Sequence, residues 1–455
     1  MRKLLCLTLP LAAALVGCHG GSGTTGISGT TGSTGGSSGG GGYDFTDLPT
    51  LQNPAPNDFA VAAMAPDGRI GVAYYGRIDE THRSVDYLEV ETDGTTRNTA
   101  IETITDKSNL SLAFDDGGTA YVAYFGNDPS VDEPHETNAP VLPDGGMAVF
   151  WEQSDVGLAA VAPDGTLTKG YPVHDSGEAN GPRPALNNTG EVVGFSPAVV
   201  SLGGEVVIAY RDVHAGQFPN QDWSVSDWES AFGAPGSWQH LMMVPGSDQG
   251  GNFVHVGLGA ATSAAVLDGK VLAVCGGAPD ADAQIVGLYA SVFDGTAWSA
   301  GQALFANVTP KITGNDGAGP KVASDPVAGF GVTWPDANHS IVRYSSSPDG
   351  VTWSPAEQAF GVGTGGQYPS LAFDPISHQP VIAFYICSRM AGVNTCNDTD
   401  DELSLAKRRT DGTWAVETVD PEGGIYPTVL FNGGQLEVVY RTLAGGLRIA
   451  RARAP

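Results

Sequence analysis

The chain has 455 residues and carries 22 lysines and arginines against 50 aspartates and glutamates, a net charge of −28. Because so acidic a protein repels phosphate backbones, the composition argues against a nucleic-acid partner. The length suffices for one large β domain or for two ordinary domains.

The first segment, residues 1–17, has the features of a secretory signal peptide. Two basic residues precede an apolar run from Leu4 to Val16, which is too short to span a bilayer as a helix. The run ends in LVGC, residues 15–18, which resembles the lipobox of bacterial lipoproteins. The resemblance implies cleavage before Cys18 and acylation of that cysteine. An ordinary secreted protein is the alternative.

Residues 18–42 are interpreted as a flexible tether behind the lipidated cysteine. From His19 to Gly42 nearly every residue is Gly, Ser or Thr, so the segment is expected to behave as a coil of roughly 25–30 Å end to end. In lipoproteins of Gram-negative bacteria, a residue other than Asp after the cysteine, here His19, implies sorting to the outer membrane. We therefore expect a cell-envelope protein whose only membrane contact is its lipid, on the periplasmic or the surface-exposed side.

Residues 43–455 carry a repeat of about seven copies. Each copy has an alternating run, an Asp/Gly turn and a second apolar run that often ends in an aromatic residue. The first turns lie near Asp67, Asp115, Gly203, Asp268, Asp325, Asp374 and Gly433. Asp-Gly between short apolar runs is a strong hairpin signal, because glycine accepts the positive φ that the turn requires.

A second Asp-Gly turn recurs within the copies, as in ETDGTT, APDGTL, FDGTAW, PDGVTW and TDGTW. Two hairpins give four strands per copy, and the consecutive apolar residues of runs such as YVAYF predict strands that are buried on both faces. Four-stranded sheets stacked around an axis satisfy this pattern, so the sequence predicts an all-β protein with a single seven-bladed β-propeller. Six or eight blades remain alternatives, above all because the stretch between Val173 and Asp268 is irregular.

The last copy has only three strands, around Thr428–Phe431, Leu436–Arg441 and Leu447–Arg453. The segment Tyr43–Leu51 lies before the first copy. We predict that it supplies the missing strand and closes the ring.

The decapeptide SSSPDGVTWS, Ser345–Ser354, resembles the Asp-box of sialidase-type (BNR-repeat) propellers, although it is one residue short. The matching residues are Ser347, Asp349, Gly350, Thr352 and Trp353. In that family the Asp-boxes are structural turns away from the active site, so the resemblance bears on the fold more than on the activity.

One face of the predicted propeller gathers most of the side chains that could bind a ligand. If the four strands of a blade are called a to d, the a–b and c–d turns share one face and the longer b–c and d–a connections share the other, as recognition loops on a rigid scaffold do. The ligand-binding candidates on this face are Tyr75, His82, Tyr210, Asp212, His214, Trp334, Tyr368, Tyr385 and Tyr426.

Three functions compete for this face. The preferred one is a non-catalytic recognition module for a glycan or protein ligand, because aromatic and Asp/Asn side chains suit stacking on sugar rings or holding peptides. The alternative is a sialidase-like glycosidase, whose family clamps a carboxylate with three arginines; Arg211, Arg389 and Arg441 are the weak candidates. Against it, the family's Arg-Ile-Pro signature is absent and no Tyr/Glu pair can be identified, so no catalytic residue is assigned.

Metal binding is the third function considered. NDTDDE, residues 397–402, offers Asp398, Asp400, Asp401 and Glu402 as oxygen ligands for calcium, though without the spaced register of a calcium loop. A solvated acidic loop is the alternative. A zinc site would require His82, His214 and His339 to converge from three loops. No cofactor is required by this interpretation, and we expect a monomer.

The five cysteines have separate roles. Cys6 lies in the signal segment and Cys18 is the lipid site, whereas Cys387 and Cys396 lie in one short loop and are expected to form a disulfide in an oxidising compartment. Such a bond would contribute roughly 2.5–3 kcal/mol in the chain-entropy view. Cys275 stands in an apolar run and is predicted to be a buried, unreactive side chain.

Overall fold

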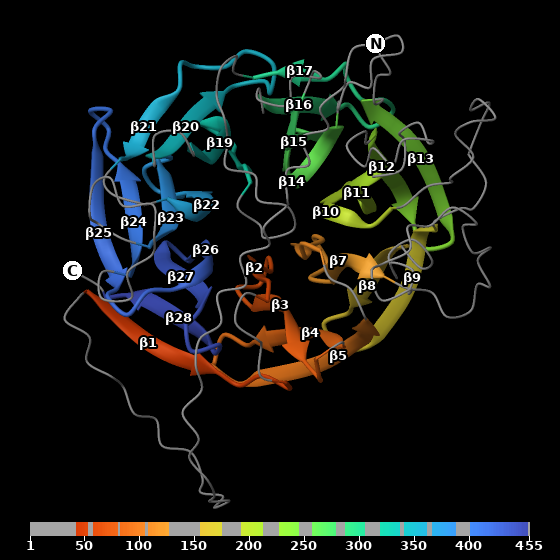
Figure 1. The fold of residues 1–455 in the computed structure, drawn as a ribbon, viewed down its shortest axis with the longest axis horizontal. Helices are drawn as coiled ribbons and strands as arrows, with labels where there is room; N and C mark the ends of the chain where they lie inside the picture. Colours follow the sequence, from red (N-terminus) through yellow and green to blue (C-terminus); the bar gives the residue numbers. More distant parts are fainter. Residues whose placement is uncertain are drawn as a thin grey trace, which may run out of the picture. The chain divides into compact units, whose positions relative to one another are not determined.

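The computed structural model is a seven-bladed β-propeller, and each blade is a four-stranded antiparallel sheet (Figure 1). The residues that it describes are 42–52, 58–80, 82–104, 108–126, 155–174, 193–212, 227–244, 257–278, 287–304, 319–336, 341–361, 366–387 and 401–453. No helix occurs among them, and none therefore is long and apolar enough to cross a membrane. The predicted all-β class and the predicted count of seven blades are confirmed.

The blades follow the chain in order, and each runs from an inner strand to an outer one. Blade 1 is β2 (Ala60–Met64), β3 (Ile70–Arg77), β4 (Arg83–Val90) and β5 (Thr96–Ile104). Blade 2 is β6 (Ser111–Phe114), β7 (Ala120–Gly126), β8 (Asp155–Val161) and β9 (Leu167–His174). Blade 3 is β10 (Phe195–Leu202), β11 (Glu205–Asp212), β12 (Asp227–Ala234) and β13 (Ser237–Val244).

The remaining blades repeat this order. Blade 4 is β14 (Gly257–Leu267), β15 (Lys270–Ala278), β16 (Gly287–Phe293) and β17 (Gln302–Ala303). Blade 5 is β18 (Lys321–Asp325), β19 (Gly329–Asp336), β20 (Ile341–Ser347) and β21 (Glu357–Phe360). Blade 6 is β22 (Gln367–Phe373), β23 (Pro380–Ile386), β24 (Glu402–Arg408) and β25 (Trp414–Asp420). Blade 7 is β26 (Ile425–Asn432), β27 (Gln435–Arg441), β28 (Leu447–Ala452) and β1 (Tyr43–Leu48).

Strand β1 closes the ring, as predicted. It pairs antiparallel with β28 over six residues, from Tyr43 opposite Ala452 to Leu48 opposite Leu447, and so becomes the outer strand of blade 7. Figure 1 shows the first strand of the fold beside the last. The two ends of the fold are thus joined by a ladder of backbone hydrogen bonds.

The second strands of the blades are buried on both faces. All eight residues of β19 and all seven of β23 are buried, and β3 has only Arg77 exposed. Each blade packs between two neighbours, so neither face of its second strand meets water. This arrangement explains why the second strands have apolar residues at consecutive positions.

The Asp-Gly turns are stabilised within their own few residues. In the turn of Ser345–Ser354, the Asp349 carboxylate accepts hydrogen bonds from the backbone N–H groups of Val351 (2.8 Å) and Thr352 (2.7 Å). Gly350 has a φ of +78° and donates its N–H to Ser347 Oγ at 2.8 Å. The backbone N–H of Thr352 is the leading cause of the lowered pKa of Asp349, about 2. These bonds are local, so the turn acts in the fold and not at a ligand site.

Candidate functional site

The starts of the seven inner strands, β2, β6, β10, β14, β18, β22 and β26, surround the axis of the ring (Figure 1). At four of these starts the pairing register shifts, and a residue that is not glycine takes a φ of 48–51°. These residues are Ser196, Ala261, Tyr368 and Tyr426. Such a conformation is uncommon for a bulky residue, and a bulge re-aims the side chains beside it. The strand starts lie on the face of the d–a connections, where the sequence predicts the site.

Hydroxyl groups near the starts of four inner strands join a blade to the next one. A Ser or Thr side-chain oxygen of one inner strand accepts a hydrogen bond from a backbone N–H of the neighbouring inner strand. The pairs are Val199 N to Ser111 Oγ (2.9 Å), Val322 N to Ser263 Oγ (3.1 Å), Val429 N to Ser370 Oγ (3.0 Å) and Ala62 N to Thr428 Oγ1 (3.2 Å). In blade 5 the equivalent residue is Lys321, which follows Pro320 as Ser370 follows Pro369.

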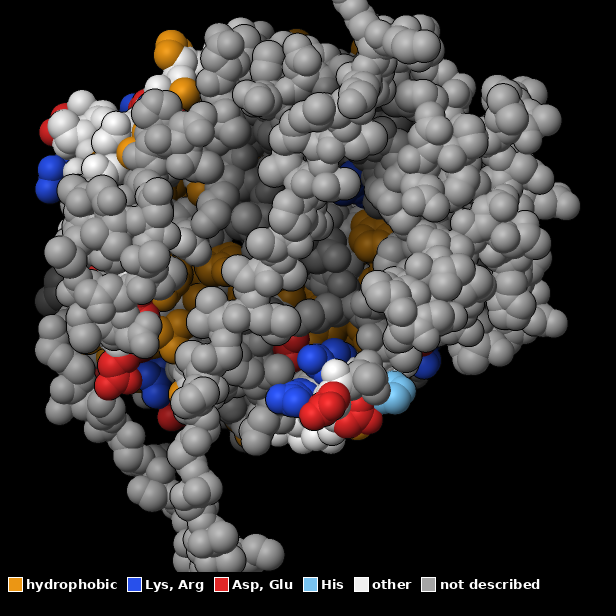
Figure 2. Space-filling view, viewed as in Figure 1, with side chains coloured by type: hydrophobic (Ala, Val, Ile, Leu, Met, Phe, Trp, Pro, Cys, Tyr) orange, Lys and Arg blue, Asp and Glu red, His pale blue; other side chains and the backbone are white. Residues whose placement is uncertain are grey.

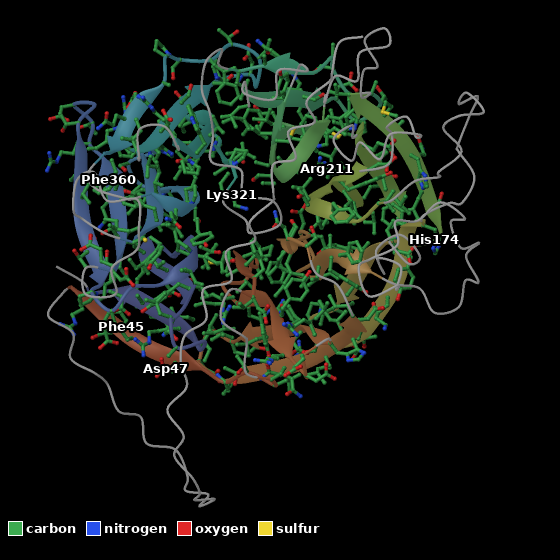
Figure 3. All side chains as sticks on the ribbon, viewed as in Figure 1. Phe45, Asp47, His174, Arg211, Lys321 and Phe360 are labelled. Atoms are coloured by element: carbon green, nitrogen blue, oxygen red, sulfur yellow. The ribbon has the colours of Figure 1, made fainter. Side chains whose placement is uncertain are left out.

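A cavity of about 170 Å³ lies at these strand starts and is lined by residues of all seven blades. We call it the channel cavity. Five of its lining residues supply aromatic or polar side chains beyond the hydroxyls: Phe59, Asn109, Lys321, Tyr368 and Tyr426. Figure 3 shows Lys321 on the inner side of its blade. Figure 2 shows hydrophobic side chains between the grey segments in the middle of the same view, with charged side chains directly below them.

Aromatic rings from blades 1, 6 and 7 form one cluster at the channel cavity. The ring centroids of Phe59 and Tyr426 are 4.8 Å apart, and those of Tyr368 and Tyr426 are 4.6 Å apart. Tyr385 stacks on Tyr368 at 6.4 Å. The structure therefore brings together three predicted ligand-binding residues, Tyr368, Tyr385 and Tyr426. The fourth ring of the cluster, Phe59, was not predicted from the sequence.

The other predicted aromatic residues pack inside the fold. Tyr75, Tyr210 and Trp334 are at most 1% exposed and belong to three hydrophobic clusters between blades. The hydroxyl of Tyr210 donates to Glu229 at 2.8 Å. In this conformation these three side chains offer no surface to a ligand.

The predicted polar residues lie apart from the channel cavity. His82 is 43% exposed in its side chain, and its Nδ1 lies 2.9 Å from a carboxylate oxygen of Asp79. Asp212 is fully buried at the end of β11. His214 and His339 lie outside the described residues, so the zinc alternative stays untested.

The three candidate arginines differ in their surroundings. Arg441 is fully buried and donates a hydrogen bond to the backbone carbonyl of Asp58, whereas Arg211 is half-buried. Burial lowers the pKa of both guanidinium groups. Neither is among the described residues that line the channel cavity. Arg389 lies outside the described residues, so the three-arginine clamp stays a prediction.

The calcium and disulfide predictions fall partly outside the described residues. Asp398, Asp400 and Cys396 lie there, as does the lipid site Cys18. Asp401 and Glu402 are 8% exposed, and Glu402 accepts hydrogen bonds from Ser404 and Thr418 of its own blade. Among the described residues, no three His, Cys, Asp or Glu side chains are placed to hold a metal ion. Cys387 is disulfide-bonded, whereas Cys275 is buried and forms no disulfide.

Two polar residues of the channel cavity were missed in the sequence. The amine of Lys321 lies 5.8 Å from the centroid of the Phe59 ring, and burial lowers the pKa of Lys321 to about 8. Asn109 is 2% exposed, and neither atom of its side-chain amide has a hydrogen-bond partner. Aligning GPK at 319–321 with YPS at 368–370 and YPT at 426–428 would have revealed the lysine, because it interrupts a series of small hydroxyl residues.

A second cavity, of about 730 Å³, lies in the outer part of blades 1 and 2. Burial raises the pKa of Asp86 in its wall to about 6, and the carboxylate of Glu102 accepts hydrogen bonds from Tyr124 and Tyr171. None of the described residues that line this second cavity was predicted as a site residue.

No protein-family model and no curated protein matches the chain. Among solved structures, a protein of unknown function from Dyadobacter fermentans is similar at 12% identity and a TM-score of 0.43, over 76% of this chain and 94% of that one. The Hadza microbial sialidase Hz136 is similar at 14% and 0.46 (85% and 73%), and the Trypanosoma rangeli sialidase at 13% and 0.43 (80% and 56%). These similarities carry no conclusion about the activity of this chain.

Proposed function

We propose that the protein is a lipid-anchored recognition module of the cell envelope that binds a glycan at the channel cavity without catalysing a reaction. The observation that carries the proposal is the aromatic cluster of Phe59, Tyr368 and Tyr426 in the cavity wall. Aromatic faces stack on the apolar faces of sugar rings, and a few polar groups then fix the orientation. A cavity of about 170 Å³ holds a small group better than a folded partner.

Replacing Tyr368 is expected to weaken glycan binding. Tyr368 is half-buried, so Tyr368→Ala removes a ring that a sugar could reach. Alanine adopts the positive φ of this position about as readily as tyrosine does, so the backbone should not change. We expect a loss of at least about tenfold in affinity, or roughly 1.4 kcal/mol, measured by titration with glycans first identified on an array. Tyr121→Ala is the matched control, because Tyr121 lies on β7 and contacts Asp115 at the opposite face.

The same protein should be tested with fluorogenic glycosides, including sialosides, with and without calcium. Turnover that Arg211→Ala abolishes would replace this proposal by the sialidase-like alternative. Binding of a peptide but of no glycan would replace the ligand class. Equal loss of affinity in Tyr121→Ala and Tyr368→Ala would remove the cavity from the proposal.

The proposed anchor rests on the sequence LVGC and has its own test. When the full gene product is expressed in a Gram-negative host with labelled palmitate, we expect label in the wild-type protein and at least a tenfold loss in Cys18→Ala. Cys6→Ala is the control, since Cys6 lies inside the signal segment and should not change the labelling. Label that persists in Cys18→Ala would contradict lipidation at this residue.

A further inference from the structure

The described wall of the channel cavity contains one cationic side chain, Lys321, and no anionic side chain that could pair with it. The protein has a net charge of −28, yet no aspartate or glutamate is among the described residues that line this cavity. Within the described part of the chain, the contact recorded for the Lys321 amine is the Phe59 ring. Lys321 is half-buried, and withdrawing a charge from water is costly unless the charge is paired.

The position of Lys321 also carries a structural cost. Four other blades use this position for a hydroxyl that accepts a hydrogen bond from the next blade, and a lysine has no acceptor with which to replace it. Lys321 starts β18 in blade 5, whereas Phe59 precedes β2 in blade 1. Its amine therefore extends across the cavity toward blade 1.

Asn109, which lines the same cavity, provides a second and independent observation. Asn109 precedes β6 of blade 2 and is 2% exposed. Neither the donor nor the acceptor of its side-chain amide has a hydrogen-bond partner. Buried amides are nearly always hydrogen-bonded, to protein or to a bound molecule. The cavity thus presents a cation, a free donor and a free acceptor.

We propose that the channel cavity binds a small monovalent hydroxycarboxylate group, held by Lys321 and Asn109. The carboxylate would accept hydrogen bonds from the lysine ammonium and the Asn109 amide N–H, while the neighbouring hydroxyl donates to the Asn109 carbonyl oxygen. One cation, with no second charged side chain among the described residues of the wall, suits a single negative charge better than a dianion such as phosphate. The group is either a free small acid or the end of a larger ligand, and the inference holds whether or not the protein binds a glycan.

Titration of the full chain with sodium glycolate tests this site. Acetate lacks the hydroxyl, glycolamide lacks the charge, and sodium chloride controls for ionic strength. We expect glycolate to bind with a dissociation constant of about 1 mM or tighter, acetate more weakly, and glycolamide at least tenfold more weakly. Chloride that matches glycolate in affinity, or glycolamide that matches it, would overturn the proposal.

Two variants and a pH series make the test specific. Lys321→Met keeps the length of the side chain without its charge and should lose glycolate binding at least tenfold, while Lys321→Arg should retain it. Asn109→Leu should abolish the preference for glycolate over acetate. Unchanged affinity in Lys321→Met would overturn the site, and all variants are checked for folding by their thermal transitions.

The wild-type protein alone gives the pH arm. Binding requires the protonated amine, so affinity should be constant well below pH 8 and fall by up to about tenfold for each pH unit above the pKa of the unliganded Lys321, which is about 8. The only other titratable side chains among the described lining residues are Tyr368 and Tyr426. Affinity that does not change between pH 6 and pH 10 would contradict the role of Lys321. If a glycan found on the array competes with glycolate, the hydroxycarboxylate group is part of that glycan. If the glycan and glycolate bind at the same time, the channel cavity binds a free small acid.

Discussion

A chain that begins at Asn53, without strand β1, is expected to lose at least about 5 kcal/mol of stability and to aggregate. β1 contributes six paired residues to blade 7, and the side chains of Tyr43 and Leu48 are 3% and 8% exposed. Burial of each such side chain stabilises by roughly 1.5–3 kcal/mol, and the ladder of hydrogen bonds adds to it. Without β1, the edge of β28 is left open to pair with another chain. Urea unfolding and size-exclusion chromatography measure both effects.

The control for this truncation is a chain that begins at Gly42 and keeps β1. A second control removes only an exposed contact of the strand. Asp44 pairs with Arg453 at 2.8 Å, but the two side chains are 69% and 48% exposed, so Asp44→Asn should cost less than about 1 kcal/mol. If the chain that begins at Asn53 unfolds at the same urea concentration as the chain that begins at Gly42, β1 does not hold the ring closed.

The fold could be predicted because its determinants are local and repeated. Each Asp-Gly turn is built within a few residues, as the bonds of Asp349 to Val351 and Thr352 show, and the same pattern recurs along the chain. The missing strand of the last blade was found by counting. Neither inference needs knowledge of which blade packs against which.

The candidate site was only partly predictable, because it depends on contacts between blades. Tyr75, Tyr210 and Trp334 are aromatic like Tyr368 and Tyr426, but they pack between blades, and sequence spacing does not distinguish the two groups. The distinction arises from the bulges that start four inner strands, where Tyr368 and Tyr426 adopt a positive φ. Lys321 could be recognised as a candidate binding residue only from the closed ring, in which Phe59 and Asn109 line the same cavity.

Replacing Glu89 is expected to destabilise the junction of blades 1 and 2 by about 3–5 kcal/mol. Glu89 is 1% exposed and forms ion pairs with both Arg69 and Arg97. The two arginines also bond to blade 2, through the carbonyls of Gly118 (3.1 Å) and Pro163 (3.0 Å). Glu89→Ala removes the buried partner of the 5% exposed Arg69 and leaves it only Asp67, which lies 2.7 Å away and is 56% exposed in its side chain. Removing one member of a buried ion pair is strongly destabilising. The loss is measured as the shift in urea midpoint at constant slope.

A double-mutant cycle separates this charge effect from loss of packing. The cost of Glu89→Ala could come from the Arg69 guanidinium that loses its buried partner. In that case, replacing both residues by apolar ones of similar length, as in Glu89→Leu with Arg69→Met, should recover most of the lost stability. The reason is that a buried ion pair is often no more stabilising than a well-packed apolar substitute. Glu89→Gln should fall between, since it keeps acceptors but not charge. A double variant whose loss equals the sum of the two single losses would show instead that each side chain stabilises the junction independently, through its own contacts with blade 2.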